Sequence, residues 1–265
     1  MTDMLLQDSH DQISGCRILT LNRGEQRNSL SRAMLAEIAD AVDAANSDKS
    51  VKVVVIRGNG PAFCAGHDLK ELTSHRGDDD KGSAFYRDTM RQCSDLMQKI
   101  VRCPKPVIAC VHGIATAAGC QLVASCDLAI AGVSASFATP GVNLGLFCST
   151  PMVALGRNLS RKHAMEMLLI GEAVDAKRAA EIGLINRAVP DEELDAAVDE
   201  FAEKLTSKPA YSVAVGIEGF YKQLEMPLTD AYDYVSEVMV NNMLADDAKE
   251  GIGAFLGKRK PVWPE

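Results

Sequence analysis

The sequence lacks a surplus of basic residues, and this absence bounds the partners that the protein can have. Its 265 residues include 28 Lys and Arg against 36 Asp and Glu, so that the net charge is −8. Neutralising the phosphates of a nucleic acid requires a basic face. We therefore expect no nucleic-acid partner, and any anionic ligand has to be held by a local site.

Paired cysteines and metal-ligand spacings are also missing. The eight cysteines form no CxxC pair, and the five histidines do not fall at ligand spacing with them. Most of the cysteines lie in apolar runs, which in a domain of this size favours buried thiols over disulfides. The sequence therefore predicts no metal site.

The start of the chain shows no secretory signal, because three aspartates among the first eleven residues interrupt it before an apolar region forms. The most apolar segment, 106–126, contains a histidine, two glycines and a glutamine and ends at Asp127. These residues favour a buried strand, turn and helix over a membrane span. We expect a cytoplasmic protein without a membrane partner.

What the chain does contain is a regular alternation of short apolar runs and helical patterns, with 47% apolar residues to build a core. Strands separated by helices favour parallel pairing and an α/β architecture. A helix is expected after Ser31, and another with Asp68 as its N-cap and Glu71 completing a capping box. Five runs predict strands, at 16–22, 51–58, 105–113, 127–132 and 184–190.

The second part of the chain is mainly helical from Glu192 onward. We place a division near residue 200, with a core at 1–200 and a C-terminal helical region at 201–265. The charged, glycine-bearing segment 75–82 is predicted to be a mobile loop.

Two turns connect a strand to a helix through small residues. One ends in Ala65-Gly66 and the other in Ala117-Ala118-Gly119. The first N–H groups of a helix have no intrahelical partner, and small residues allow a ligand to approach them. Each turn alone is equally well explained by a close helix–sheet contact. Two such turns in one sheet can each aim an N–H at a single oxygen that gains negative charge, such as the enolate of a thioester.

Four segments together resemble the crotonase (enoyl-CoA hydratase/isomerase) superfamily over nearly the whole chain: 21–31, 63–72, 111–131 and 169–190. The resemblance implies a ββα spiral core followed by a C-terminal helical trimerisation region. It implies an acyl-CoA thioester as substrate or ligand, with coenzyme A as part of it and no permanently bound cofactor. It also implies a homotrimer or homohexamer and a role in fatty acid and lipid metabolism.

The resemblance assigns roles to individual positions. The backbone N–H groups of Ala65 and Ala118 fall where the family polarises the thioester oxygen; Ala118 replaces the usual glycine. The positions that contact coenzyme A are Gln26, Arg27, Ser29, Leu30, Ala65, His67, Asp68 and Leu69, with Phe255 and Lys258 in a tail segment that often comes from a neighbouring subunit.

The residues that carry protons in the family's hydratases are absent. These enzymes use two glutamates, and the matching positions here are Gln121 and Gly141. A glutamine side chain hydrogen-bonds but has no accessible protonation change. His67 and Ser149 are the other candidate catalytic residues, although a ring that faces nucleotide or solvent and a packed hydroxyl explain them better.

Three functions remain open on this reading. The first is an enoyl-CoA hydratase-like lyase with an atypical active site. The second is another crotonase reaction on an acyl-CoA, such as hydrolysis, isomerisation or decarboxylation, that uses oxyanion stabilisation and a positioned water. The third is a protein that binds or senses acyl-CoA without turnover.

Overall fold

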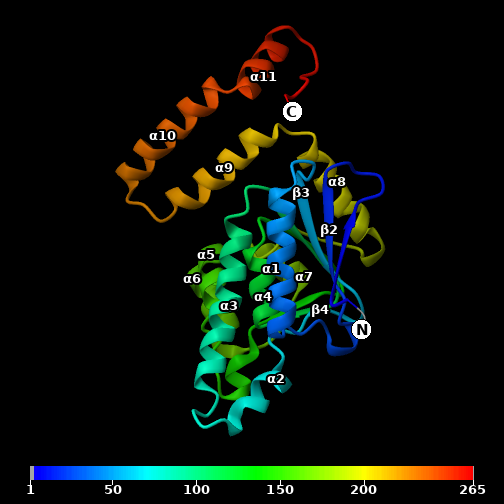
Figure 1. Cartoon of the computed structure of the whole chain (residues 1–265), viewed down its shortest axis with the longest axis vertical. Coiled ribbons are helices and arrows are strands. Elements are labelled where there is room, and N and C mark those ends of the chain that lie inside the picture. Colours follow the sequence, from blue (N-terminus) through cyan, green and yellow to red (C-terminus); the bar gives the residue numbers. More distant parts are fainter. Residues whose placement is uncertain (1–2, 265) are drawn as a thin grey trace.

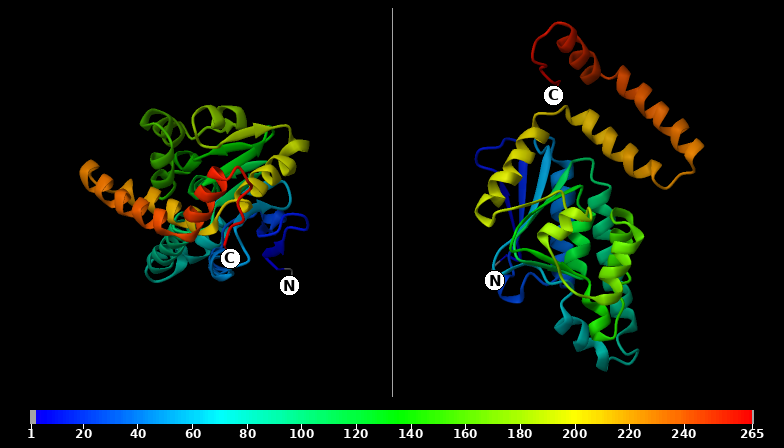
Figure 2. Two further views of the ribbon diagram at one scale, coloured as in Figure 1. Left: turned by 90° about the horizontal axis from the view of Figure 1, so that it is seen from above. Right: turned by 180° about the vertical axis from the view of Figure 1, so that it is seen from behind.

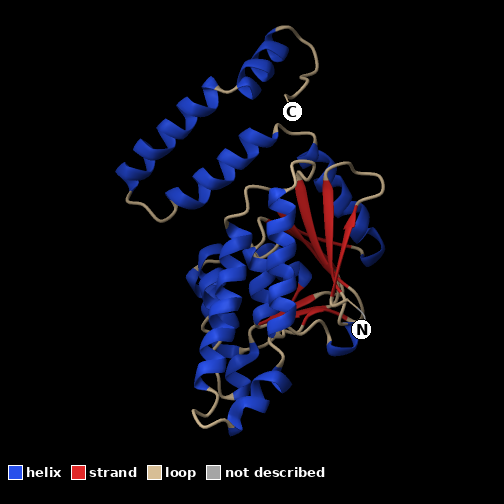
Figure 3. Cartoon of the chain, viewed as in Figure 1, coloured by secondary structure: helices blue, strands red, loops and turns tan. Residues whose placement is uncertain are grey.

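The computed structural model describes residues 3–264, which form two β-sheets surrounded by helices (Figures 1 and 3). In the larger sheet, β1 pairs antiparallel with β2 and every other pair of neighbours is parallel. Its strand order is β1 (Leu5–Ser9), β2 (Cys16–Leu21), β3 (Val53–Gly58), β5 (Val107–Val111), β7 (Leu128–Gly132) and β10 (Arg187–Val189).

The smaller sheet runs across one end of the larger one (Figure 3). Its strands are β4 (Ala62–Cys64), β6 (Ile114–Thr116), β8 (Ser136–Ala138) and β9 (Val174–Asp175), of which the first three are parallel. Three times in succession the chain passes from a long strand into a short one and then into helical structure. This repetition is the predicted ββα spiral, and it places the loops after β4 and β6 beside each other.

Helices cover both faces of the larger sheet, so its central strands are apolar on both sides. Alternate residues of β3 belong to different cores: Val54 and Ile56 pack under α1 and α3, whereas Val53 and Val55 pack under α8. The helices before the C-terminal region are α1 (Arg32–Ser47), α2 (Leu69–Ser74), α3 (Ser83–Val101), α4 (Ala118–Ser125), α5 (Pro151–Asn158), α6 (Arg161–Ile170) and α7 (Ala176–Glu181). Short 3₁₀ turns are η1 (Gly24–Gln26), η2 (His75–Gly77), η3 (Pro140–Leu144) and η4 (Asp191–Glu193).

Several local predictions are confirmed. All five predicted strands are present, and Ser31 and Asp68 cap α1 and α2. All eight cysteines are buried free thiols. The segment 75–82 is more structured than predicted, because it includes η2 and because Asp80 accepts hydrogen bonds from the N–H groups of Gly82 and Ala84.

The C-terminal region consists of α8 (Leu194–Thr206), α9 (Ala210–Gln223), α10 (Leu228–Leu244) and α11 (Asp246–Leu256). Residue 200 lies inside α8, and α8 packs on the larger sheet through Leu194, Val198 and Ala202. Helices α9 to α11 instead project from the core (Figures 1 and 2). The division at residue 200 and the use of this region for trimerisation stay predictions. No helix among residues 3–264 is both long and apolar enough to cross a membrane.

Candidate functional site

The loop between β4 and α2 pairs with the segment that precedes α1. Leu30 N–H donates to the Gly66 carbonyl at 2.8 Å, and Asp68 N–H donates to the Leu30 carbonyl at 3.1 Å. The Asp68 side chain caps α2 by accepting from the N–H groups of Lys70 and Glu71. Glu71 does not close the predicted capping box: its side chain accepts from Arg32 N–H at 2.9 Å and so joins α2 to the start of α1.

The prediction that the Ala65 amide serves as an oxyanion donor is wrong. Ala65 N–H donates to the Arg27 carbonyl at 2.9 Å, so this donor is already used inside the fold. Gly66 then adopts a left-handed conformation, φ +85°, which turns the chain between Ala65 and His67. The His67 N–H has no acceptor among the described residues. His67, two positions further on, therefore supplies the open amide of this loop.

The loop between β6 and α4 places the Ala118 amide at the start of a helix. Ala117 N–H donates to the Ala138 carbonyl at 2.9 Å, and Ala117 has φ 50° and ψ −116°. Within residues 3–264 the N–H of Ala118, the first residue of α4, has no acceptor. The helix starts against β4, because a Cβ on Gly119 would lie 2.1 Å from the Cys64 carbonyl oxygen.

These two loops touch at their glycine and alanine residues. A Cβ on Gly66 would lie 3.2 Å from the Ala118 nitrogen and 2.9 Å from the Thr116 carbonyl oxygen. The Thr116 hydroxyl also donates to the Ala65 carbonyl at 3.0 Å. The small residues therefore permit a close helix–sheet contact that places the loop before His67 beside the Ala118 nitrogen. That two amides share one acceptor stays a prediction.

The structure gathers the predicted coenzyme A positions of the first half of the chain around this contact. Gln26, Arg27 and Leu69 are exposed, whereas Ser29 and Leu30 are buried. Arg23, which sequence reasoning missed, organises the group: its guanidinium donates to the Ser29 carbonyl at 2.9 Å and pairs with Asp68 at 3.2 Å.

Asp68 is committed to these structural contacts. Its partial burial raises the carboxyl pKa, but the hydrogen bond from Glu71 N–H and the charge of Arg23 outweigh this and hold the pKa below its usual value. A carboxylate that is charged, capped and paired is poorly suited to exchange protons with a substrate.

Phe255 and Lys258 do not join this group within one chain. They lie in α11 and just after it, and α11 is at the opposite end of the molecule from α2 (Figure 1). The Phe255 side chain is 81% exposed. Their predicted contact with coenzyme A accordingly requires a neighbouring subunit.

The two positions that are predicted to match the family glutamates differ in their surroundings. Gln121, in the first half of α4, is 4% exposed, and its Oε1 lacks a hydrogen-bond partner in the described part of the chain. Gly141 lies against Cys148: a Cβ there would be 2.9 Å from the Cys148 Sγ and 3.1 Å from its nitrogen. The space that a side chain at 141 needs is therefore filled.

Within the described part of the chain, the two other candidate catalytic side chains, His67 and Ser149, have no base or acid bonded to them. Both ring nitrogens of His67 are buried without a partner in residues 3–264, and burial lowers the pKa of this histidine, an effect that the Leu30 backbone offsets only in part. Burial therefore favours the neutral form of the ring. Ser149 is exposed, and its hydroxyl donates to the Phe147 carbonyl at 3.3 Å.

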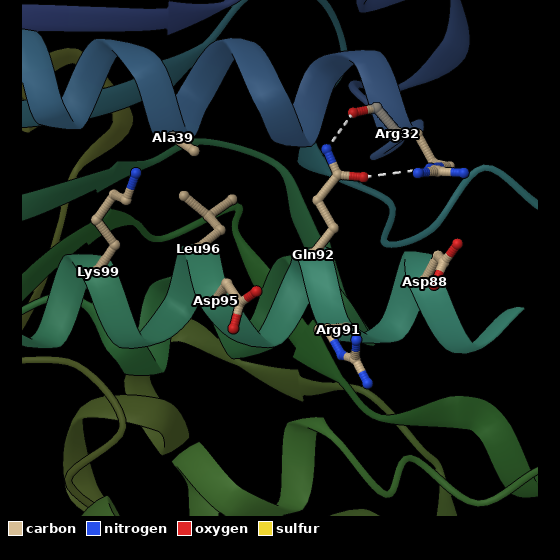
Figure 4. A pocket seen from close by; sticks show the side chains of 8 residues that line it. All are labelled: Arg32, Ala39, Asp88, Arg91, Gln92, Asp95, Leu96 and Lys99. Carbon is tan, nitrogen blue, oxygen red and sulfur yellow. Dashed lines mark hydrogen bonds between the residues drawn. The ribbon is translucent and has the colours of Figure 1, made fainter. Parts of the chain in front are cut away.

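A groove between α1 and α3 lies apart from this site (Figure 4). None of the predicted site residues lines it, and two contacts join its two helices, one between Arg32 and Gln92 and one between Lys99 and Asp43 of α1. Gln92 donates to the Arg32 carbonyl at 2.8 Å and accepts from the Arg32 guanidinium at 3.4 Å. We interpret it as a polar helix–helix contact. Across residues 3–264, no cluster of three or more His, Cys, Asp or Glu residues could hold a metal ion.

Comparison with known proteins places these features in context. A family model described as enoyl-CoA hydratase/isomerase matches residues 12–265. The chain is 47% identical over 252 residues to enoyl-CoA hydratase domain-containing protein 3, mitochondrial, of Mus musculus, covering 95% of this chain and 82% of that protein. The Homo sapiens protein of the same name is 47% identical over 254 residues, again with 95% and 82% coverage.

Solved structures agree with this likeness. An enoyl-CoA hydratase from Mycobacterium smegmatis superimposes with a TM-score of 0.93 at 48% identity, covering 98% of this chain and 99% of the other. The structure of human enoyl coenzyme A hydratase domain-containing protein 3 gives a TM-score of 0.92 at 45% identity, with 98% and 100% coverage. The names of the similar mouse, rat, human and frog proteins include "mitochondrial", which overturns the predicted cytoplasmic location.

Proposed function

This chain belongs to the enoyl-CoA hydratase/isomerase (crotonase) family, and we propose that it binds an acyl-CoA thioester with the carbonyl oxygen between the N–H groups of His67 and Ala118. The observation that carries the proposal is the close approach of Gly66 to the Ala118 nitrogen. A Cβ built on Gly66 would lie only 3.2 Å from that nitrogen. Two open amides on neighbouring loops are suited to one shared acceptor.

Such an arrangement stabilises negative charge on the thioester oxygen. Backbone donors are held in place before the reaction, so they do not have to reorganise as the charge develops. The N-terminus of α4 adds partial positive charge at the Ala118 amide. An enolate or an oxyanion at this point is therefore favoured over the same species in water.

Hydration additionally requires groups that move protons, and here the site departs from an efficient hydratase. Gln121 does not titrate, and Cys148 fills the space at Gly141. We therefore propose a hydratase-like protein with little or no hydration activity. The filled position at Gly141 also favours a second candidate, acyl-CoA binding or sensing without turnover.

The complete site also involves a neighbouring subunit in this proposal. Phe255 and Lys258 sit on a segment that projects away from their own chain's loops (Figure 1). In a homotrimer, or a homohexamer built from two trimers, they would close over the coenzyme A of the adjacent subunit. We propose that the protein acts in fatty acid metabolism, in which acyl-CoA thioesters are the reacting species.

A comparison of two ligands tests the carbonyl contact directly. Butyryl-CoA carries the thioester carbonyl, whereas its thioether analogue S-butyl-CoA lacks only that oxygen. We expect the wild type to bind butyryl-CoA about tenfold more tightly, equivalent to about 1.4 kcal/mol, as measured by titration calorimetry. Equal affinity for both ligands would contradict the proposal.

The variant Ala118→Pro tests whether the Ala118 amide is one of the two donors. It removes one N–H at the first position of α4, where proline is best tolerated in a helix. We expect the preference for the thioester to disappear while S-butyl-CoA still binds, and a thermal unfolding curve checks that the variant is folded. An undiminished preference would show that this amide is not the donor.

Turnover is assayed separately by mass spectrometry on a panel of acyl-CoA esters, including crotonyl-CoA. We expect hydration of crotonyl-CoA to be absent or slow. Hydration with a kcat of about 10 per second or more, typical of ordinary enzymes, would show that Gln121 and Gly141 do not limit the chemistry.

A further inference from the structure

The last residues of the chain turn back onto α11. The Glu250 carboxylate, in α11, accepts hydrogen bonds from Arg259 Nη1 at 2.5 Å, from Arg259 Nη2 at 2.7 Å and from Val262 N–H at 2.7 Å. A two-pronged arginine–carboxylate pair fixes direction as well as distance. The hydrogen bonds from Arg259 lower the pKa of Glu250 to about 2, so the carboxylate stays charged at neutral pH. Glu250 therefore holds the segment 259–262 against its own helix.

Trp263, the only tryptophan of the chain, fastens the same segment to the core. Its indole Nε1–H donates to the carbonyl of Ser207, the residue that ends α8, at 2.8 Å. A Cβ on Gly251 would lie 3.2 Å from the indole ring, so the ring packs on α11 as well. Figure 1 shows the segment running from the end of α11 back toward the junction of α8 and α9. Because α8 packs on the larger sheet, Trp263 links α11 to the core.

Between α11 and this segment, Lys258 has a left-handed backbone, φ 51°, which a residue with a Cβ seldom adopts. Lys258 N–H donates to the Phe255 carbonyl at 3.2 Å. Arg259 N–H donates to the Ala254 carbonyl at 3.0 Å, so that the turn closes the end of the helix. Lys258 is exposed and its ammonium group has no ion-pair partner among residues 3–264, whereas the next cation, Arg259, is paired. The turn therefore presents one free positive charge and uses the next one to keep its shape.

We propose that Glu250, Arg259 and Trp263 form a clasp that positions Lys258 for contact with a phosphate group of coenzyme A. The inference rests on the proposed acyl-CoA function, in which Lys258 reaches the ligand of the neighbouring subunit, and it adds three positioning residues to that site. A lysine on a loose tail would lose conformational freedom on binding, whereas a lysine on a turn that is already held loses less. In a chain with a net charge of −8, such a held cation concentrates the attraction for an anionic ligand at one place.

A pair of ligands isolates this contact, because S-butyryl-pantetheine lacks the nucleotide and the phosphates of butyryl-CoA. We expect Lys258→Ala to weaken butyryl-CoA binding about tenfold in titration calorimetry and to leave S-butyryl-pantetheine binding unchanged. Glu250→Gln keeps the size of the side chain but weakens the pair with Arg259, and should weaken butyryl-CoA binding about fivefold. The double variant should bind butyryl-CoA no more weakly than Lys258→Ala alone, because Glu250 acts through Lys258.

Glu218→Gln is the matched control. It removes one negative charge from an ion pair with Lys222 inside α9 and leaves the clasp untouched. Both glutamine variants change the net charge by the same amount, so a difference in affinity between them reports the clasp and not the overall charge. Glu218→Gln should bind butyryl-CoA as wild type does.

Trp263 also reports whether the clasp is closed, since it is the only source of tryptophan fluorescence. We expect Glu250→Gln to shift its emission toward the red, because the indole becomes exposed to water, and Lys258→Ala to leave the emission unchanged. Trp263→Phe keeps a ring against Gly251 but loses the N–H that bonds to Ser207, and should weaken butyryl-CoA binding about threefold. Sedimentation velocity checks that the variants keep the oligomeric state of wild type, and thermal unfolding checks that they are folded.

The outcomes separate this inference from the proposed function. If wild type binds neither ligand, the acyl-CoA function itself is wrong. The clasp alone is overturned if Lys258→Ala binds butyryl-CoA as wild type does, if the losses from Lys258→Ala and Glu250→Gln add, or if Glu250→Gln leaves the Trp263 emission unshifted. It is also overturned if Glu250→Gln changes the oligomeric state, since the segment would then hold subunits together rather than position a lysine.

Discussion

The two loops that meet at the site make the same turn from strand to helix with different residues. In the first, Gly66 takes φ +85°, a conformation open to glycine at little cost, and Asp68 caps α2. In the second, Ala117 takes φ 50° and ψ −116°, which a residue with a Cβ rarely adopts, and no side chain caps α4. The first loop is stabilised by its own residues, whereas the second is held in a strained form by its surroundings.

This difference gives the two loops different roles: the capped loop stabilises the fold, and the uncapped loop offers N–H groups to a ligand. A capped helix start uses its N–H groups within the fold, but an uncapped one leaves them open to a ligand. The second loop therefore carries both the strain and the most open amides, as is common at binding sites. Four substitutions test this comparison, from the largest expected effect to the smallest.

Gly119→Ala should destabilise the protein most. The added methyl would lie 2.1 Å from the Cys64 carbonyl oxygen, and neither the helix nor the strand can move away without losing backbone hydrogen bonds. We expect a loss of more than about 3 kcal/mol of unfolding free energy in urea titrations. The control is Gly156→Ala in exposed α5, where a Cβ meets nothing within 4 Å and alanine should stabilise by about 0.5–1 kcal/mol. Similar effects for both variants would refute the close contact.

Gly66→Ala should come next. It places a Cβ at φ +85° and 2.9 Å from the Thr116 carbonyl oxygen. We expect a cost of about 2–3 kcal/mol and a loss of the preference for butyryl-CoA over S-butyl-CoA, because the His67 amide would be displaced. A variant as stable and as selective as wild type would remove the argument that this glycine is needed to turn the chain.

Ala117→Gly should have the opposite effect and raise the free energy of unfolding. Relief of the positive φ is worth about 1–2 kcal/mol, and the extra flexibility of glycine in the unfolded chain costs about 0.5–1 kcal/mol. We expect a net stabilisation of roughly 1 kcal/mol. Ala124→Gly, within α4, is the control and should destabilise by about 1 kcal/mol. If both changes destabilise alike, Ala117 is not strained.

Asp68→Ala should cost about 1 kcal/mol at pH 7, through loss of the α2 cap. Because the folded pKa of Asp68 is below its unfolded value of about 3.9, its contribution is present above that pH and disappears as the pH falls through the folded pKa. The stability difference between wild type and variant should therefore shrink as the pH falls below about 4. Asp40→Ala, on the exposed face of α1, is the control and should change the unfolding free energy at pH 7 by less than about 0.5 kcal/mol.

Much of the fold was predictable because it depends on local patterns. Dihedral preferences acting within a few residues explain the strand formed by the β-branched run at 53–58. Hydrogen bonds over equally short distances along the chain explain the helix caps at Ser31 and Asp68. The family resemblance located the two loops for the same reason, since their small residues are visible in the sequence.

The details of the site were less predictable because they depend on contacts between distant segments. Nothing near Ala65 in the sequence shows that its amide is taken by Arg27, and the open donor is consequently at His67.

The sequence by itself determined the α/β class and the succession of strands and helices, and it carries the prediction that Gln121 and Gly141 stand where hydratases of the family have glutamates. Only the tertiary structure decided which amides stay open, that Cys148 occupies the space beside Gly141, and that the strain falls on Ala117. The physical reason is that periodicity and capping act over one or two turns of chain. Hydrogen-bond partners and free volume are instead set by segments that meet only after folding.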